Sequence, residues 1–343
     1  MPNTSAEPFR SAAAGEWLAS SYADVQAILA DDRFEVPGVG AAEAAVGTIS
    51  WLRSSASRFV NGPEHARRRA LLVDQLHGLE PEQLRSAADR RTQAVLAAAG
   101  RRGDRVDVMD RIARRVPMAV LAAGLGLADP DRAAEAVVAI AGCYLTGADR
   151  QAQPAADAAT AELVGMFGAV AMDVVVARIT LLAQGCDGTA GLIGTALHVV
   201  QDAAQAAAGW TTDDLLSEVL RHSPPVRLSR RVGRAQADFG DCRVGAGDVV
   251  LCSVDAANRD PAVFGRPAEF DPARRGQPSM TFGYGIRPCP GQAQALMLAA
   301  GVIDAVRLRC EFLAGEPVSY EASAALRIPR RLDVILARSA ADS

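Results

Sequence analysis

Residues 282–291 read FGYGIRPCPG, and residues 292–308 after them have the composition of a helix. Glycine lets a backbone approach a flat ligand closely, and Arg287 places a fixed cation close to Cys289. The N–H groups and the positive dipole end of the following helix are expected to lower the pKa of the Cys289 thiol. A thiolate on such a turn can serve as a soft ligand to a metal ion. The stretch therefore predicts Cys289 as a metal ligand.

The other five cysteines are scattered, without a CxxC pair or the spacing of a zinc site. A long chain with a large core has little need of disulfides, and isolated cysteines usually serve as small buried hydrophobes. We therefore expect buried thiols at Cys143, Cys186, Cys242, Cys252 and Cys310.

The overall composition is that of a globular protein. Of the 343 residues half are hydrophobic, the formal net charge is −4, and all 36 basic residues are arginine. No long run of one charge indicates a nucleic-acid partner. Residues 1–17 lack the charged and apolar regions of a signal peptide, and no apolar stretch reaches the ~18 residues of a membrane span. We expect a cytoplasmic protein with no nucleic-acid partner and no membrane segment.

Apolar spacing divides the chain into a large helical part and a small β part. The clearest helical ranges are 81–98, 105–125, 157–200 and 212–221. The strand patterns are at 226–232, 242–244, 249–252, and in a short pair at 318–320 and 332–336. Residues 258–291 are rich in Pro, Gly and Asp, and such a long irregular segment is usually functional. We expect a single, mainly α domain over residues 1–343, because no linker divides the chain.

The loop at 282–291 resembles the signature of the cytochrome P-450 family, Phe-Gly-x-Gly-x-His/Arg-x-Cys-x-Gly, and further matches extend over nearly the whole chain. The resemblance implies the cytochrome P-450 fold, a helical domain with a small β region that holds haem between a long distal helix and the loop of the cysteine ligand. It also implies haem b as the cofactor. The residues of this loop that it assigns to the haem are Phe282, Gly283, Arg287, Gly291 and Cys289, the last as ligand of the iron.

The resemblance assigns four cations to the haem propionates. Residues 62–69, GPEHARRR, are similar to the family's Pro-Pro-Glu-His-x-Arg-x-Arg helix start. His65 and Arg69 share one helix face, as two donors to one carboxylate must. Arg231 matches the family's arginine after the Glu-x-x-Arg helix, and Arg287 completes the set. Taken alone, Arg67 to Arg69 would be a solvated charge run and His65 a helix-capping residue.

Two further segments resemble structural parts of the family. Residues 218–221, EVLR, match the Glu-x-x-Arg pair, and residues 270–274, FDPAR, match the meander with a second arginine. In the family these residues are buried supports behind the haem loop. Without the resemblance, Glu218 and Arg221 would be an exposed ion pair worth roughly a few tenths of a kcal/mol.

Residues 182–189, LAQGCDGT, resemble the long distal helix over the haem, usually Ala-Gly-x-Glu/Asp-Thr-Thr/Ser. Asp187 keeps the acid, Gly188 replaces the threonine that orders proton delivery to oxygen, and Thr189 matches the next position. These three are the candidate catalytic residues. Glycine inside a helix costs about 1 kcal/mol relative to alanine, so Gly188 indicates space or a kink over the iron, or else sequence drift.

The chain is short for this family. Residues are missing from the N-terminus, from the 34–63 loop and from the 126–185 segment, which must hold the paired lid helices over the substrate. A trimmed lid predicts a wide, wet pocket for a bulky natural product, a peptide or a carrier-tethered intermediate. The alternative is that the remaining helices pack closer and form a small, tight pocket.

The function that the resemblance implies is an oxidoreductase in secondary-metabolite biosynthesis. The leading hypothesis is a monooxygenase that hydroxylates or epoxidises a small organic or natural-product substrate, using dioxygen and electrons from a ferredoxin-type donor with its reductase. A second hypothesis keeps the haem but expects oxidative coupling, ring closure, desaturation or peroxide-driven oxidation, because Gly188 lacks the relay hydroxyl. A third hypothesis is a family-like auxiliary protein that has lost its catalytic activity. Such a protein would be expected to lack Cys289 or the propionate cations, and this sequence has both.

Overall fold

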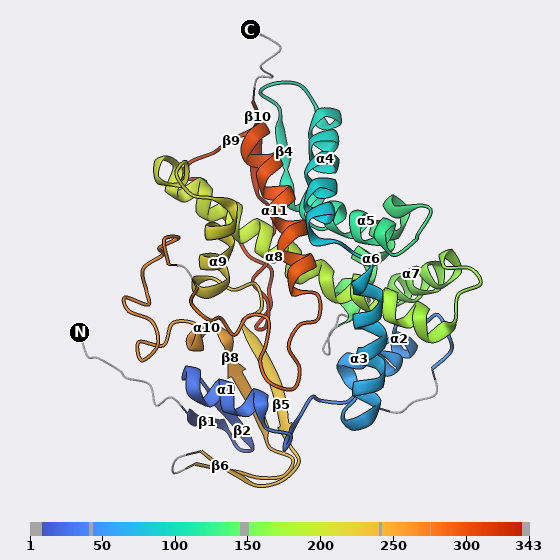
Figure 1. Ribbon diagram of the computed structural model, residues 1–343, viewed down its shortest axis with the longest axis vertical. Coiled ribbons are helices and arrows are strands. Elements are labelled where there is room, and N and C mark those ends of the chain that lie inside the picture. The colour runs from blue at the N-terminus through green and yellow to red at the C-terminus, as the bar shows by residue number, and fades with distance from the viewer. Residues whose placement is uncertain (1–8, 41–43, 145–150, 240–241, 275, 338–343) are drawn as a thin grey trace. The chain divides into compact units, whose positions relative to one another are not determined.

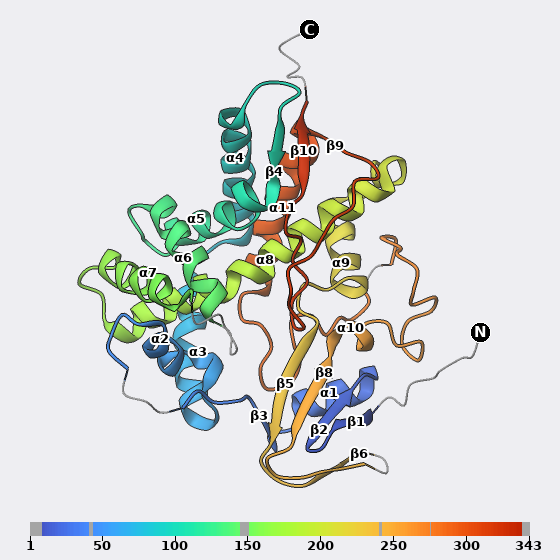
Figure 2. The same ribbon diagram turned by 180° about the vertical axis from the view of Figure 1, so that it is seen from behind.

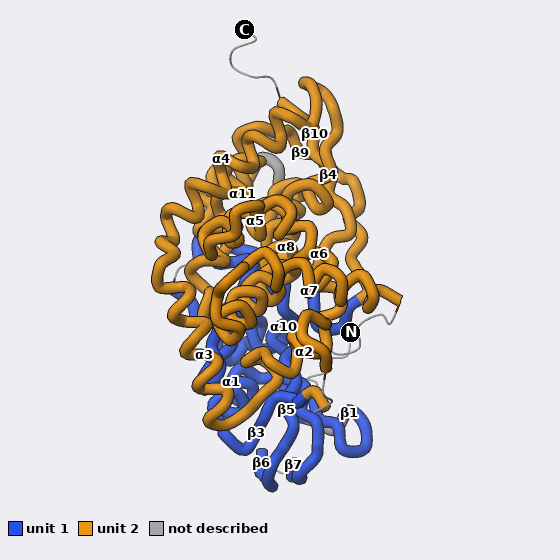
Figure 3. The backbone as a smooth tube through the Cα atoms, turned by 90° about the vertical axis from the view of Figure 1, so that its right-hand side faces the viewer, with its two compact units in different colours: residues 1–38, 217–289, 323–327 blue, residues 39–216, 290–322, 328–343 orange. Residues whose placement is uncertain are grey.

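A computed structural model describes residues 9–40, 44–144, 151–239, 242–274 and 276–337. The chain divides into two compact units, which Figure 3 shows in different colours. Unit 1 comprises residues 1–38, 217–289 and 323–327, and unit 2 comprises residues 39–216, 290–322 and 328–343. Each unit has a sheet and buried hydrophobic residues of its own.

Unit 1 contains a five-stranded sheet in the order β1-β2-β8-β5-β3. Its strands are β1 (Phe9–Ala13), β2 (Glu16–Ala19), β3 (Phe34–Glu35), β5 (Leu228–Gly233) and β8 (Val249–Ser253). Strand β8 pairs parallel with β2 and antiparallel with β5, so segments far apart in the sequence form the centre of the sheet (Figure 1). Val250 and Cys252 of β8 point to the buried side, as the period of two in a strand requires.

Two short helices and a hairpin complete unit 1. They are α1 (Tyr22–Ala30), α10 (Val254–Ala257), β6 (Ala237–Phe239) and β7 (Cys242–Val244). The core of unit 1 includes Phe264 and Met280, which come from the predicted irregular segment. In the described parts of residues 258–291 there is neither helix nor strand, as predicted, yet these two buried side chains fix the segment to the core.

Unit 2 is mainly helical. Its helices are α2 (Ile49–Ser55), α3 (Gly62–His77), α4 (Pro81–Ala99), α5 (Arg115–Gly124), α6 (Pro130–Tyr144), α7 (Gln153–Met166), α8 (Met172–Ala207) and α11 (Gln292–Arg309), while α9 (Thr212–His222) crosses from unit 2 into unit 1. A Cβ at Gly301 of α11 would lie 2.1 Å from the carbonyl oxygen of Arg85 in α4, so this glycine lets the two helices approach closely. Among the described residues no helix, α8 included, is apolar over the length that a membrane crossing needs.

The sheet of unit 2 has three antiparallel strands in the order β4-β10-β9. They are β4 (Arg105–Asp107), β9 (Cys310–Phe312) and β10 (Asp333–Leu336). The predicted strand at 332–336 is therefore confirmed, but its predicted partner at 318–320 is wrong. Val334 of β10 pairs with Val106 of β4 on one side and with Phe312 of β9 on the other. β10 is therefore the central strand of this sheet.

Two of the predicted helices are wrong in extent. The range 105–125 begins with β4 and a π-helical turn, Met109–Ala113, because its first residues pair with β10 instead of with the next helical turn. The range 157–200 is divided between α7 and α8. Gly168, with a φ of 59°, lies in the left-handed region between these two helices. The predicted ranges 81–98, 212–221 and 292–308 match α4, α9 and α11 closely.

The 126–185 segment holds α6, α7 and the beginning of α8. Helices α6 and α7 pack against each other, and both contact α8 (Figure 2). The backbone N–H of Ile49 in α2 donates to the carboxylate of Asp157 in α7 at 2.7 Å. Two helices therefore occupy the segment predicted to hold the lid, and a hydrogen bond ties the second of them to α2.

Candidate functional site

The signature loop makes a tight turn, and its residues 282–289 belong to unit 1. The backbone N–H of Cys289 donates to the carbonyl of Phe282 at 2.7 Å and closes the loop. Gly283 and Gly285 have φ angles of 76° and 64°, a region that favours glycine. A Cβ at Gly285 would lie 2.5 Å from the Cα of Ala30, so a larger residue would clash with α1. The glycines thus fix the backbone path that presents Cys289.

Cys289 is exposed, whereas four of the other cysteines are buried and Cys242 is half-buried. Burial raises the pKa of Cys252 to about 12 and that of Cys310 to about 11, so both remain thiols near neutral pH. The prediction of buried thiols is confirmed at four of the five positions. Cys289 is the cysteine that is accessible to a ligand.

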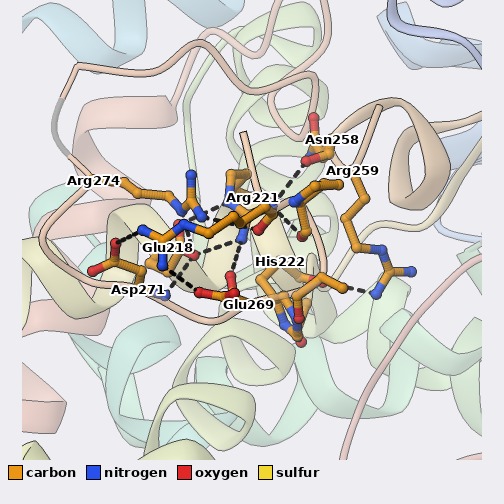
Figure 4. Close-up of polar contacts among 12 residues, drawn as sticks. Glu218, Arg221, His222, Asn258, Arg259, Glu269, Asp271 and Arg274 are labelled. Carbon is orange, nitrogen blue, oxygen red and sulfur yellow. Dashed lines mark hydrogen bonds and ion pairs between the residues drawn. The ribbon is translucent and has the colours of Figure 1, made fainter. Parts of the chain in front are cut away.

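The Glu218–Arg221 pair lies in the interior of unit 1 (Figure 4), with exposed fractions of 1% and 3%. Arg221 Nε and Nη2 donate to the two Glu218 oxygens at 2.8 and 2.6 Å. Its Nη1 and Nη2 also donate to the carbonyls of Pro267 and Glu269, each at 2.8 Å. A buried charge pair with its hydrogen bonds satisfied is a structural support, so the alternative of an exposed ion pair is wrong.

The meander adds a second arginine to this pair. Arg274 Nε lies 3.6 Å from Glu218 Oε1, and Nη1 and Nη2 of Arg274 donate to the carbonyls of Gly265 and Arg266 at 2.6 and 2.9 Å. The backbone N–H of Asp271 donates to the same Glu218 oxygen at 2.8 Å. Glu218 therefore binds the meander to α9 (Figure 4).

Asn258 links α9 to the beginning of the signature loop. Its fully buried side chain donates from Nδ2 to the Leu220 carbonyl at 3.0 Å and to the Thr281 hydroxyl at 2.9 Å. Its Oδ1 accepts from the backbone N–H of Met280 at 2.8 Å. Sequence reasoning gave Asn258 no role of its own beyond its place in the irregular segment 258–291.

The two candidate propionate cations of unit 1 are Arg231 and Arg287. Arg231, in β5, is 8% exposed, and its Nη1 donates to the Ser229 hydroxyl at 2.7 Å and to the Arg230 carbonyl at 3.0 Å. Both of these acceptors are neutral. Arg287 is half-buried in the signature loop. Buried or half-buried guanidinium groups suit a ligand that carries carboxylates.

Helix α3 in unit 2 carries the other two candidate cations. His65 is 8% exposed and Arg69 is half-buried, at the spacing that places them on one helix face. The N-cap of α3 is Asn61, so the alternative that His65 caps the helix is wrong. The position of His65 in the first helical turn is the one that the resemblance predicted.

Arg67 and Arg68 both pair with Glu64. Arg67 Nε and Nη2 lie 2.9 and 2.8 Å from its oxygens, and Arg68 Nε lies 2.5 Å away. These contacts, first those of Arg67, hold the pKa of Glu64 low, at about 2. Arg68 also donates to the Ser54 carbonyl at 2.7 Å, and its side chain is only 21% exposed. The alternative of a solvated charge run therefore fits Arg67 but not Arg68, which links α3 to α2.

Asp187, Gly188 and Thr189 follow one another on α8 in unit 2. The helix is uninterrupted at Gly188, and apart from the adjoining residues and backbone of α8 itself no described heavy atom lies within 4 Å of a Cβ placed there. This observation agrees with the interpretation of added space. The side chain of Thr189 is 3% exposed. Asp187 Oδ1 accepts from Arg114 Nε at 3.2 Å.

Sequence reasoning missed two residues of this region, Arg114 and Glu321. Arg114 Nη2 donates to Glu321 Oε1 at 2.5 Å while its Nε contacts Asp187. Burial raises the pKa of Asp187 above its usual value, Arg114 opposes the shift, and the charge of Glu321 adds to it. Neither residue is near Asp187 in the sequence or in a recognisable motif, so no sequence signal pointed to them.

The donor set fits a haem group. An exposed cysteine on a glycine-shaped turn suits an axial thiolate, and the buried and half-buried cations suit the two carboxylates of the macrocycle. Unit 1 holds the loop residues through Cys289 together with Arg231. Unit 2 holds His65 and Arg69 on α3, residues 187–189 on α8, and Gly291. The carbonyl of Gly291 accepts from the backbone N–H of Ala295 in the first turn of α11 at 2.9 Å.

Comparisons with known proteins show the family of this chain. A family model described as "Cytochrome P450" matches residues 211–314. The cytochrome P450 monooxygenase PikC of Streptomyces venezuelae is 30% identical over 353 residues, covering 89% of this chain and 81% of that protein. The 6-deoxyerythronolide B hydroxylase of Saccharopolyspora erythraea is 24% identical, with coverage of 84% and 81%.

Solved structures share the fold. P450BioI, in complex with an acyl carrier protein ligated to hexadec-9Z-enoic acid, superposes with a TM-score of 0.83 at 20% identity and covers 96% of this chain and 95% of its own. CalO2 gives a TM-score of 0.82 at 22% identity, with coverage of 96% and 93%. The fold is therefore the mainly α cytochrome P-450 fold that the sequence predicted. The chain belongs to the cytochrome P450 family of monooxygenases, which are oxidoreductases that use haem.

Proposed function

We propose that the chain is a monooxygenase containing haem b, with Cys289 as the thiolate ligand of the iron. The observation that carries the proposal is the exposed Cys289 on a turn closed by Phe282 and shaped by Gly283. Gly291 precedes α11, so a thiolate at this turn comes shortly before a helix N-terminus, which favours negative charge. When bound, the haem supplies the redox-active iron at which dioxygen is activated.

His65, Arg69, Arg231 and Arg287 would hold the two propionates of the haem. Arg231 and His65 are each 8% exposed, so a carboxylate that reaches them is removed from water and interacts more strongly with their charge. The four residues thereby select an anionic macrocycle and fix its orientation. Their role stays a prediction, as do the single domain over residues 1–343 and the cytoplasmic location.

Asp187 and Thr189 would move protons toward the reacting oxygen. Asp187 is partly buried and its pKa is raised by burial, which brings the carboxyl closer to the range in which it exchanges protons during turnover. Gly188 provides space but no hydroxyl. The missing hydroxyl has to come from Thr189, from a water molecule or from the substrate.

Electrons would come from a ferredoxin-type protein with its reductase. The exposed Arg67 on α3 is a cation that an acidic partner can contact, since its side chain is 56% exposed. The substrate would be a natural product, a peptide or a carrier-tethered intermediate of secondary metabolism. Support comes from the relative named as a 6-deoxyerythronolide B hydroxylase and from the structural neighbour in complex with an acyl carrier protein.

Isotope labelling tests the proposed reaction. The holoenzyme, a ferredoxin and its reductase are supplied with ¹⁸O₂ and a panel of macrolide aglycones and fatty acyl groups on acyl carrier protein. A monooxygenase transfers one labelled oxygen atom to the product and reduces the other to water. Product that forms only with the electron donors and carries one ¹⁸O supports the proposal. Product without label contradicts it.

The open position at Gly188 favours a second candidate function. Oxidative coupling, ring closure and desaturation leave no oxygen from dioxygen in the new bond, and peroxide-driven oxidation needs no electron donor. The same assay therefore separates the candidates: unlabelled coupled or unsaturated product identifies the first group, and product formed with hydrogen peroxide alone identifies the second.

A further inference from the structure

Three charged side chains of unit 2 form a connected cluster at Asp187. Arg114 Nε lies 3.2 Å from Asp187 Oδ1, and Arg114 Nη2 lies 2.5 Å from Glu321 Oε1. The side chains of Arg114 and Asp187 are 18% and 20% exposed, and that of Glu321 is 36% exposed. One guanidinium therefore serves two carboxylates in a partly buried place, where charges interact more strongly than in water.

Arg114 and Glu321 are both held in place by the fold of unit 2. Arg114 directly precedes α5, which packs against α8. The backbone N–H of Glu321 donates to the Ile328 carbonyl at 2.9 Å, and the ring of the adjacent Tyr320 packs edge-on against His198 of α8 at 6.3 Å. Glu321 is therefore fixed on unit 2 at a set distance from Arg114.

The charges of the cluster do not balance. With both carboxylates ionised, Arg114 leaves one negative charge over. The buried thiol of Cys186 next to Asp187 has a pKa raised by burial, so it stays neutral and adds no charge. A proton on Asp187 would restore neutrality, and the two partners affect that proton in opposite ways: Arg114 disfavours it and Glu321 favours it.

We propose that Arg114 and Glu321 are positioning residues for the proton-handling carboxyl of Asp187: Arg114 orients it and weakens its hold on the proton, and Glu321, by sharing Arg114, strengthens that hold. The inference rests on the proposed function, since it assigns the cluster to proton delivery. Arg114 and Glu321 lie outside the distal motif, so this cluster extends the site to α5 and to the C-terminal part of unit 2.

Infrared difference spectroscopy of the holoenzyme measures this directly. The protonated-carboxyl band of Asp187 is identified by its absence in Asp187→Asn and is followed against pH. Arg114→Ala should raise the proton affinity of Asp187 roughly tenfold to a thousandfold, the usual effect of a lost neighbouring cation. Glu321→Gln should lower it. Shifts of opposite sign are a signature that general loosening of the structure does not produce, and Arg114→Lys should restore most of the wild-type value.

Matched controls lie close to Arg114 and Glu321 in the sequence. Arg115 is the next residue and pairs with Glu135 at 3.6 Å, and the Glu316 side chain pairs with Arg105. Arg115→Ala and Glu316→Gln should leave the Asp187 titration unchanged. The inference is overturned if Arg114→Ala and Glu321→Gln shift the band in the same direction, or if neither exceeds the controls.

The pH profile of coupled turnover separates this inference from the proposed function. As a proton donor, Asp187 should govern the alkaline limb of this profile, which should move to higher pH in Arg114→Ala and to lower pH in Glu321→Gln, together with the infrared titration. If the titration shifts as expected while the pH profile does not, Asp187 is coupled to the cluster but does not deliver protons, and the inference fails. If the reduced wild-type enzyme lacks the thiolate–carbonyl band, the proposed function fails, whatever the titration shows.

Discussion

Gly188 leaves α8 without a hydroxyl at the position where the family resemblance places one. A Cβ there would meet no described atom of unit 2, so this unit has room for a side chain that the sequence omits. Proton delivery then depends on groups nearby, and Thr189, with 3% of its surface exposed, is the adjacent hydroxyl. With a substrate that brings no hydroxyl of its own, reduced oxygen should often leave as peroxide.

Restoring the hydroxyl should improve coupling. A positioned proton donor contributes roughly 10²- to 10⁴-fold to a proton-transfer step, so Gly188→Thr should raise the ratio of product to hydrogen peroxide for poorly fitting ligands. Gly188→Ala adds the Cβ without a hydroxyl, so it should leave the ratio of product to hydrogen peroxide unchanged. The check is peroxide and product yield per NADPH consumed. Equal ratios in the two variants would mean that the relay runs elsewhere.

Residues that belong to a sequence motif were predicted well, whereas residues that only contact a motif residue from elsewhere in the chain were not. Cys289 is marked by the glycines that its turn requires, and the structure shows that this turn leaves it exposed. Glu218 and Arg221 were predicted as a buried pair from a motif. Arg114 was not predicted at all, because a contact with Asp187 over such a separation in the sequence depends on how α5 packs against α8.

Helix α9 and the meander form the element that supports the signature loop. Glu218 accepts from Arg221 and from the backbone of Asp271, and Asn258 joins α9 to the residue before the loop. These bonds lie in unit 1 with Cys289, so the position of the loop depends on a buried network of charges. Removing one member leaves a buried partner charge uncompensated.

Glu218→Gln should therefore destabilise the protein by about 3–5 kcal/mol, the usual effect of breaking a buried ion pair. Glu269→Gln is the matched control: Glu269 also pairs with an arginine three residues away, Arg266, but the two side chains are 56% and 67% exposed. It should cost less than about 1 kcal/mol. Urea unfolding of the holoenzyme measures both, and equal effects would contradict the structural role of Glu218.

Helix α3 provides a second prediction at this scale. Arg67 and Arg68 both pair with Glu64, but Arg67 is exposed whereas Arg68 also donates to the Ser54 carbonyl, so Arg67 is the better surface probe of the two. Arg67→Glu should slow electron transfer from an acidic ferredoxin and flatten its dependence on salt, while peroxide-supported turnover stays the same. Stopped-flow reduction is the measurement, with the exposed Arg243 on β7 changed to Glu as control. Equal loss in both assays would indicate damaged folding.

Elements with strong periodicity were predicted well, and those defined by distant partners were not. Helices α4 and α9 carry their own apolar spacing, and α11 was recognised from its helix-forming composition after the signature loop. The short strand β4 has no such pattern over its three residues, and it forms because β10 offers it backbone partners. The division between α7 and α8 depends on the left-handed Gly168, which apolar spacing does not show.

At the scale of the whole molecule, the shortened 126–185 segment still provides two helices, α6 and α7, and Asp157 binds the second of them to α2. We keep the prediction of an open pocket, which a large or carrier-bound substrate helps to enclose. Larger scaffolds should then bind more tightly than camphor-sized molecules, by roughly tenfold or more, since each 1.4 kcal/mol of extra contact is tenfold in Kd. Titrations that follow the haem absorption band decide this, and tighter binding of the small molecules would establish the compact pocket instead.

The central claim is that Cys289 binds the haem iron as a thiolate. The most direct test is the carbon monoxide difference spectrum of the reduced protein, measured for the wild type, for Cys289→Ser, and for Cys242→Ser as a matched control in the same unit. The account predicts the thiolate–carbonyl band in the wild type and in Cys242→Ser, and its loss in Cys289→Ser with the fold retained by circular dichroism. Persistence of the band in Cys289→Ser would contradict the account.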